Sequence, residues 1–445
     1  MTEGSNPNFG AKVHSVSHER AGHPANCHSY RRRRGHLLAV SVAAVLAPMP
    51  VAFAATDADN PIDLYFTDRY SYDDNLFRVP DGLLRSDPGA LSVQSLDDYV
   101  NRASVGLQTR LDASRQVFEA NLRFDDVRYA RNDDLNHRGG SGDLQWDWKL
   151  GGDWSGRVIG KYERALASFA NYRLFVRDIV ETASYGAELR YGIGSRWAVL
   201  GGGSWSDTDH SAQIRKINKF KSETVRGGVE YRTPSNNVFA IDYRDTAGRF
   251  PIADRIPGGL PFKYDDRQYG VSLHYAFTVI TQITARLAHE QRDYVDPRLG
   301  DYSGPTWNVL VNWAPRTKFH TDLKGWHELT AYSDAESDYF VSNGGSIAPT
   351  WEPTTMIDVT ATFSYEKQEY VGDNPILAPS ESNREDQVRA AKLGLDYAPR
   401  DYFSFGLGYT WLKRESNRSV LLNNAVLASR GYDSNFASAW FKITL

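Results

Sequence analysis

Apolar and polar residues alternate over long stretches of the chain after about position 60. The segment RASVGLQTRL (102–111) puts Val105 and Leu107 on one face and Arg102 and Arg110 on the other. The segments 117–124 and 356–366 repeat this pattern. A period of two over about ten residues predicts strands with one apolar face and one polar face. The chain after residue 54 shows no convincing helical period.

Short turns of a recurring type join pairs of these strands. An aromatic residue is followed by a tight polar turn, often with Pro, and then by the next apolar strand. Pro has no N–H to donate and presets φ, so it suits a turn better than a strand ladder. These turns lie at 112–116, 148–154, 191–197, 231–239, 275–280, 313–319, 351–357 and 397–403.

Longer connections rich in Gly and Asp separate the hairpins, at 79–97, 130–142 and 250–266 for example. Eight short turns that alternate with long loops predict about 18 strands. A repeat of about 40 residues also occurs in β-propellers, but a propeller blade needs four short strands. Each repeat here holds two strands of about 12 residues, the length of a tilted transmembrane strand. We therefore expect an all-β, antiparallel transmembrane barrel with short periplasmic turns and longer extracellular loops, and keep a soluble β-protein as the alternative.

The N-terminal region has the pattern of an export signal. Residues 31–54 read RRRRGHLLAVSVAAVLAPMPVAFA, with four arginines, an apolar run and a small-x-small site. This order predicts a signal peptide cleaved after Ala54, preceded by an N-terminal extension. The alternative is a membrane anchor, but the apolar run is too short and Pro48 and Pro50 follow it. The expected organisation is a signal region over 1–54 and the barrel over 55–445.

The last eight residues, SAWFKITL, alternate once more. Phe441, Ile443 and Leu445 occupy one face, and Trp440 and Lys442 occupy the other. An open strand edge cannot exist in lipid, so we expect this strand to close the barrel with its apolar face toward lipid. It resembles the final strand that the barrel-assembly machinery reads in outer-membrane barrels, although Leu445 stands where Phe is usual.

Composition excludes several other classes of protein. Aromatic residues make up 13% of the chain, and the single cysteine, Cys27, precedes the expected cleavage site. Disulfide frameworks, thiol nucleophiles and cysteine–zinc sites are therefore excluded. Residues 1–54 contain six of the 51 Lys and Arg and two of the 55 Asp and Glu, which leaves a net charge of −8 on the rest. This balance does not suggest a nucleic-acid binder.

Catalytic or metal-binding signatures are weak. No histidine after residue 54 has the spacing to Ser, Asp or another His of a nucleophilic or metal centre. Acidic pairs are available for Ca²⁺ but occur more often as solvated loop charge. We therefore predict no enzyme activity and no cofactor; a histidine within reach of Ser or a carboxylate at the lumen mouth would favour a barrel enzyme instead. The acidic pairs are Asp73–Asp74, Asp133–Asp134 and Asp265–Asp266.

The polar strand faces predict the lining of a channel. Basic residues outnumber acidic ones on these faces, so the loops carry the surplus acid. Such a lumen suits polar or anionic cargo moved over many weak contacts. The alternative is that these charges pair with each other and only solvate the wall. The candidate lumen residues are Arg102, Arg110, Arg123, Arg157, Lys161, Arg190, Arg226, Arg232, Arg244, Arg286, Lys324 and Lys392.

The stretch RYSYDDNLFRVPDG (69–82) resembles a family motif through Asp73, Asp74, Asn75, Phe77 and Arg78. With the signal region and the alternating strands, the chain resembles the EpsL-type outer-membrane proteins of exopolysaccharide operons, associated with exosortase B and PEP-CTERM systems. The resemblance implies polysaccharide export across the outer membrane of a Gram-negative bacterium. It also implies periplasmic and inner-membrane synthesis proteins as partners, and it carries no catalytic residues. The Asp73–Asn75 stretch is either a functional loop or a turn capped by Asp and Asn.

The expected function is passive export of a secreted exopolysaccharide through a polar lumen in contact with outer-membrane lipid. A general or sugar-selective diffusion porin is the alternative, and an enzyme acting on lipid or polysaccharide is the third hypothesis. A porin predicts a loop folded into the lumen and a trimer, whereas an exporter predicts a smooth path or a movable plug.

Overall fold

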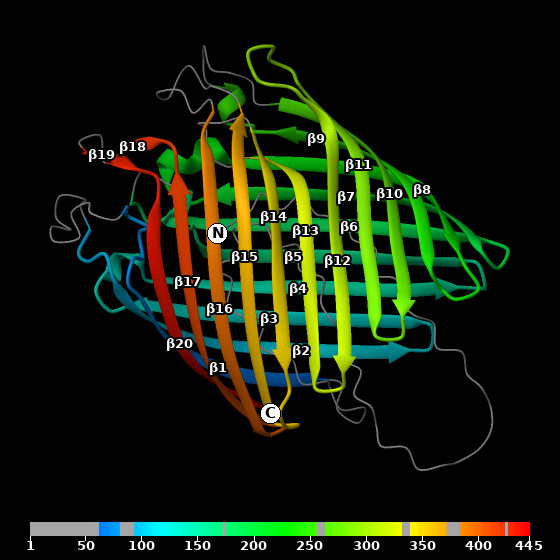
Figure 1. Cartoon of the computed structure of the whole chain (residues 1–445), viewed down its shortest axis with the longest axis horizontal. Helices are drawn as coiled ribbons and strands as arrows, with labels where there is room; N and C mark the ends of the chain where they lie inside the picture. The colour runs from blue at the N-terminus through cyan, green and yellow to red at the C-terminus, as the bar shows by residue number, and fades with distance from the viewer. Residues whose placement is uncertain are drawn as a thin grey trace.

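The computed structural model describes residues 62–80, 93–171, 175–255, 263–331, 339–371, 383–422 and 426–445, so the signal region expected at 1–54 lies outside the described residues. Eighteen antiparallel strands form one closed sheet (Figure 1). They are β1 (Ile62–Asp73), β2 (Asp98–Ala113), β3 (Gln116–Tyr129), β4 (His137–Leu150), β5 (Trp154–Leu166), β6 (Ile179–Ile193), β7 (Trp197–His210), β8 (Phe220–Arg232), β9 (Val238–Arg249), β10 (Lys263–Thr278), β11 (Thr281–Tyr294), β12 (Tyr302–Arg316), β13 (Phe319–Ala331), β14 (Tyr339–Trp351), β15 (Ile357–Val371), β16 (Glu385–Arg400), β17 (Phe403–Ser416) and β20 (Tyr432–Thr444).

Each strand pairs with its neighbours in chain order, and the last strand closes the barrel against the first. Thr444 of β20 is opposite Tyr65 of β1, and Phe436 is opposite Asp73. The predicted barrel, its 18 strands and its closing strand are thereby confirmed. A small separate hairpin, β18 (Ser419–Leu422) with β19 (Val426–Ser429), lies between β17 and β20 at the end of the barrel that carries the long loops (Figure 1).

The eight short turns all lie where the sequence predicts them, and they share the end of the barrel where β20 finishes. Two details differ. Pro315 and Pro399 sit in the irregular last residues of β12 and β16, where the pairing register shifts, and not in the turns themselves. A bulge tolerates a residue without an N–H. Residues 137–142 and 263–266, expected in loops, belong to β4 and β10 because their backbone pairs with β3 and β9.

The outward strand faces form a band of exposed apolar side chains, such as Val105 (57% exposed) and Phe124 (71%). Aromatic residues border it at both ends: Trp197 contacts Tyr231 near the short turns, and Tyr185 stacks on Trp205 nearer the loops. Eight residues separate the two tryptophans, which makes the band about 20 Å tall at about 3.3 Å per residue and a tilt near 40°. The chain is therefore an outer-membrane-type β-barrel.

The described helices are short 3-10 turns in the loops: η3 (Asp133–Leu135), η4 (Phe169–Asn171), η5 (Gln213–Asn218) and η6 (Ala253–Arg255). Within the described part of the chain, no helix has the length and apolarity to cross a membrane.

Candidate functional site: the lumen wall and the covered mouth

The structure places all twelve predicted lumen residues on the inner strand faces. Each alternates with outward apolar neighbours; Arg226, for example, lies between the exposed Val225 and the outward Gly227. By the same alternation, Leu189 and Tyr191 are on the outer face of β6 and Arg190, between them, is on the inner face. Their contact with a cargo stays a prediction, because the structure holds only the protein chain.

Most of these cations are paired with carboxylates, so the lining is less basic than the list of cations alone suggests. Nine of the twelve form ion pairs along the wall, so their charge is largely balanced. The pairs are Arg110 with Glu119, Arg123 with Asp125, Arg157 with Asp147, Lys161 with Asp143, Arg190 and Arg232 with Glu230, Arg226 with Glu188, and Arg244 and Arg286 with Asp242.

Inward charges on β2–β5 remain open to solvent. The side chains of Asp112, Asp143 and Lys161 are exposed by 60%, 52% and 63%. A barrel interior filled by side chains would bury them, so water occupies this part of the lumen. An 18-stranded barrel is wide enough for such an aqueous interior.

The opposite end, the mouth, is covered by loops. Phe77, Val79 and Leu96 from the first long loop pack with Leu135 and Phe169 from the next two, and all five side chains are buried. We call these five residues the mouth cluster. The Phe77 and Phe169 rings lie 4.7 Å apart between centroids. This apolar packing holds three loops together over one side of the barrel end.

The loop after β5 reaches toward the opposite wall of the barrel through its described turn η4 (Phe169–Asn171). Ala170 packs against a buried cluster of Val388, Ala390 and Leu412 on β16 and β17. The Ala170 carbonyl oxygen also accepts a hydrogen bond from Arg414 Nη1 at 2.9 Å. Since β1–β4 and β20 separate these strands from β5 along the wall, this loop folds inward and narrows the mouth.

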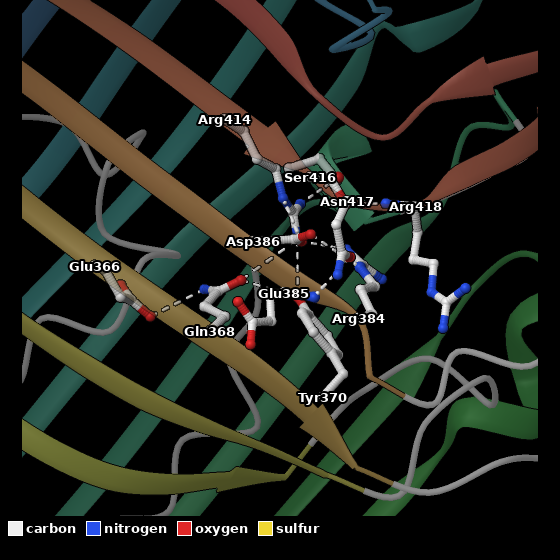
Figure 2. A network of polar contacts seen from close by, with 11 residues as sticks. Glu366, Gln368, Tyr370, Arg384, Glu385, Asp386, Arg414, Ser416, Asn417 and Arg418 are labelled. Carbon is white, nitrogen blue, oxygen red and sulfur yellow. Dashed lines mark hydrogen bonds and ion pairs between the residues drawn. The ribbon is translucent and has the colours of Figure 1, made fainter.

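A buried polar network holds Arg414 in place (Figure 2). Asp386 accepts hydrogen bonds from Arg414 Nε at 2.7 Å and from Arg384 Nε at 3.1 Å. The Arg414 Nη2 atom donates to the Tyr370 hydroxyl at 2.8 Å, and the Arg384 guanidinium lies 3.9 Å from the centre of the Tyr370 ring. Asp386 and Arg384 are fully buried, so this ion-pair network is shielded from water.

The network continues along the inner wall from β15 to β13. Tyr370 donates to Gln368 at 2.9 Å, Gln368 donates to Glu366 at 2.9 Å, and Ser342 donates to the same Glu366 oxygen at 2.7 Å. The Trp326 indole N–H then donates to Ser342 at 2.8 Å. These linked hydrogen bonds connect the inner faces of β13–β17 and support the wall that the inward loop contacts.

The family-like motif folds into a buried turn and is not exposed to a cargo. Arg78 has φ +57° and makes a two-pronged ion pair with Asp73, with both N–O distances at 2.8 Å. Asn75 is fully buried, donates to the Val79 carbonyl at 2.8 Å and accepts from the Val79 N–H at 2.8 Å. Of the two alternatives for this stretch, the turn capped by Asp and Asn describes the structure. Phe77 belongs to the mouth cluster.

The motif also joins the first strand to the last. Asp74 accepts two hydrogen bonds from Asn435, one from the backbone N–H and one from the side chain, both at 2.7 Å. Asn75 donates to the Asp433 carbonyl at 2.7 Å. These contacts fasten the closing seam between β1 and β20 at the mouth. On β20, Ile443 is exposed on the outer face and Phe441 contacts Phe66, whereas Trp440 and Lys442 point inward and are buried. Leu445, the residue after the strand, is exposed.

One histidine has a carboxylate within reach, as a barrel enzyme would require. His210 donates from Nδ1 to Asp178 at 2.6 Å, and both side chains are buried. Burial favours a raised pKa for Asp178, but the bonds from His210 and from the Ala212 N–H outweigh it and lower the pKa. The described residues place no nucleophilic hydroxyl on the other ring nitrogen, and the neighbouring Ser211 accepts from the Ile179 N–H. This pair joins the end of β7 to the residue that precedes β6 and so has a structural role.

A second histidine, His289, lies 3.4 Å from the Ser303 hydroxyl on the outer face. No described residue orients its Nδ1 atom, so the arrangement lacks the third group of a catalytic triad. Three of the six residues of the acidic pairs are engaged elsewhere: Asp73 with Arg78, Asp74 with Asn435 and Asp266 with Arg292. Asp133 and Asp134 are exposed in a loop. The described residues contain no group of three or more metal-ligating side chains.

Sequence reasoning missed Arg69, Arg384, Asp386 and Arg414. Arg69 could be found from the alternation of Leu64, Phe66 and Tyr70 around it, which places it on the inner face. The other three lie near strand ends, where alternation gives no sign that a distant loop will bury them.

No protein-family model matches the chain, and no curated protein matches it. Among solved structures, it is similar to the outer membrane protein opdK from Pseudomonas aeruginosa, with a TM-score of 0.45 and 8% identity, over 86% of this chain and 99% of the other. It is also similar to OccK11 (OpdR) from the same organism, with a TM-score of 0.41 and 11% identity over 86% and 96% of the chains. The ferric enterobactin receptor PfeA gives a TM-score of 0.44 and 10% identity over 88% and 82%. The fold assignment rests on the strand pairing of this chain.

Proposed function

We propose that the protein is a passive outer-membrane channel for polar solutes. The observation that carries this proposal is the solvent exposure of the inward charges on β2–β5, inside a closed barrel with an apolar outer band. Transport through such a lumen needs no cofactor and no catalytic residue. Residues 1–54 would direct export and the final strand would engage the barrel-assembly machinery.

The inward loop favours a diffusion channel. A loop anchored by Arg414 and by the Ala170 contacts narrows the mouth at a fixed level, as a constriction loop does. A narrow mouth selects small solutes and would obstruct a continuous polymer. The paired charges along the wall suit weak, repeated contacts with hydroxyl-rich molecules such as sugars.

Export of a secreted exopolysaccharide is the second candidate. The resemblance of residues 72–78 to EpsL-type proteins favours it, and periplasmic and inner-membrane synthesis proteins would be its partners. Under this proposal the inward loop is a plug that moves aside for the polymer.

Deletion of the gene in its host distinguishes the two candidates. The diffusion channel predicts slower uptake of small sugars with normal extracellular polysaccharide. Loss of extracellular polysaccharide with polymer build-up in the periplasm would overturn the diffusion channel and establish the exporter.

A further inference from the structure

Two lumen arginines lie directly opposite each other on adjacent strands. Arg69 of β1 and Arg102 of β2 are register partners, and both face inward. Opposite positions on one face hold side chains about 5 Å apart at Cβ, and like charges there destabilise the sheet. Neither guanidinium has a hydrogen-bond or ion-pair partner among the residues that the structure describes. Nine of the twelve predicted lumen cations form ion pairs, so the Arg69–Arg102 pair is an exception in the wall.

The carboxylates around this pair are already engaged. Asp125, diagonal to Arg102 on β3, pairs with Arg123 at 3.0 Å. Asp98 accepts the backbone N–H groups of 130–132 at 2.9–3.0 Å, and Asp73 holds Arg78. On the β20 side, Trp440 is opposite Arg69, with Lys442 two positions further. Asp396, which faces inward on β16, attracts Arg69, but the like charges of Arg102 and Arg123 act on Arg69 more strongly. The inner face around Arg69 and Arg102 therefore carries a local excess of positive charge.

The pair also lies on the route through the barrel. Ser71 and Val100 are register partners close to the mouth, because Tyr129, the partner of Val100 on β3, packs against the mouth cluster. Arg69 and Arg102 lie two residues further from the mouth along β1 and β2. Both arginines are half-buried, so their guanidinium groups keep contact with the lumen. Adjacent guanidinium groups match the geometry of an oxyanion, since each can donate two parallel hydrogen bonds to one carboxylate or phosphate.

From these observations we propose that Arg69 and Arg102, with Arg123 below them, form a binding site for an oxyanion group carried by the cargo, such as the carboxylate of a sugar acid. The proposal rests on the proposed channel function and names its preferred cargo as anionic saccharides. An oxyanion between the two guanidinium groups would turn their repulsion into two ion pairs.

Equilibrium binding to the purified full-length barrel tests this site without relying on transport. Trigalacturonate, glucose 6-phosphate and the neutral maltotriose are titrated by calorimetry into wild type, Arg69→Gln, Arg102→Gln and the control Arg110→Gln, whose guanidinium pairs with Glu119. We expect the anionic probes to bind wild type and to lose about tenfold or more in affinity in Arg69→Gln and Arg102→Gln. Arg110→Gln should stay close to wild type. Whichever anionic probe binds more tightly identifies the oxyanion as carboxylate or phosphate.

A stability measurement separates a binding role from a structural one. Removal of one of two opposed like charges should leave the thermal unfolding temperature of the barrel unchanged or raise it. Unaltered anion binding in both variants, equal binding of maltotriose, or destabilisation in both variants would overturn the site. Binding that depends on these arginines in a barrel that conducts no ions would contradict the channel function and leave the site standing.

Discussion

At the scale of the residue, pairing determines what each inward charge does. Arg78, Arg384 and Arg414 are buried in ion pairs with carboxylates and hold loops, whereas Arg69 and Arg102 face each other with no ion-pair partner among the described residues. The same residue type therefore serves structure at the mouth and, by our proposal, recognition below it. Breaking a buried pair leaves an uncompensated charge, which costs more than the pair itself contributes.

The Asp73–Arg78 pair offers a test of this difference at the closing seam. Arg78→Met leaves the Asp73 carboxylate buried and uncompensated, so we expect the free energy of unfolding to fall by about 3–5 kcal/mol. The double variant Asp73→Asn with Arg78→Met should lose less than the single variant. Urea unfolding in detergent, followed by tryptophan fluorescence, measures both. An equal or larger loss in the double variant would show that the buried charge is not the cause.

The Asp178–His210 pair predicts a pH dependence of stability. The lowered pKa of Asp178 means that its carboxylate stabilises the folded state above the unfolded pKa of about 3.9, and that this contribution is lost as pH falls through the lowered value. Asp178→Asn should therefore cost about 1–3 kcal/mol at pH 7 and progressively less below about pH 4. Thermal unfolding across this pH range measures the difference. Asp134→Asn, at an exposed loop carboxylate, is the control; a cost for Asp178→Asn that stays constant down to low pH would contradict the account.

At the scale of the element, the turn η4 (Phe169–Asn171) joins two sides of the mouth. Its anchors come from both sides of the barrel: Phe169 in the mouth cluster and Ala170 on the β16–β17 wall. This loop also shows where sequence reasoning ends. Alternation and turn residues gave the strands, the eight turns and the closing seam, because each depends on neighbouring residues. The loop packing depends on contacts such as the one from Arg414 to Ala170, between residues 244 positions apart.

The Arg414 anchor predicts a change in conductance. Arg414→Met removes the hydrogen bond to the Ala170 carbonyl and one side of the buried network, so the inward loop should detach more often. We expect a higher or noisier single-channel conductance in planar bilayers. Arg389→Met is the matched control, because Arg389 lies on the outer face of the same wall and pairs with Glu415 at 3.4 Å. Identical recordings for Arg414→Met and Arg389→Met would show that this anchor does not set the mouth width.

At the scale of the whole molecule, the inner charges on β2–β5 are open to solvent, and the described parts of three long loops pack together over the other end of the barrel. A net-acidic chain thus holds two opposed arginines on the inner wall just below its narrow end. The strand faces could be predicted from the sequence because a two-residue period fixes them. The distribution of partnered and unpartnered charges along the lumen could not, because it depends on strand register.

The central claim is that this barrel conducts polar solutes passively, and single-channel recording of the purified protein in planar lipid bilayers tests it most directly. We predict steady, voltage-independent ionic conductance and a reversal potential in a salt gradient that shows preference for anions, reduced in Arg69→Gln. A barrel that is folded by circular dichroism but gives no conductance above that of the bare bilayer would contradict the account.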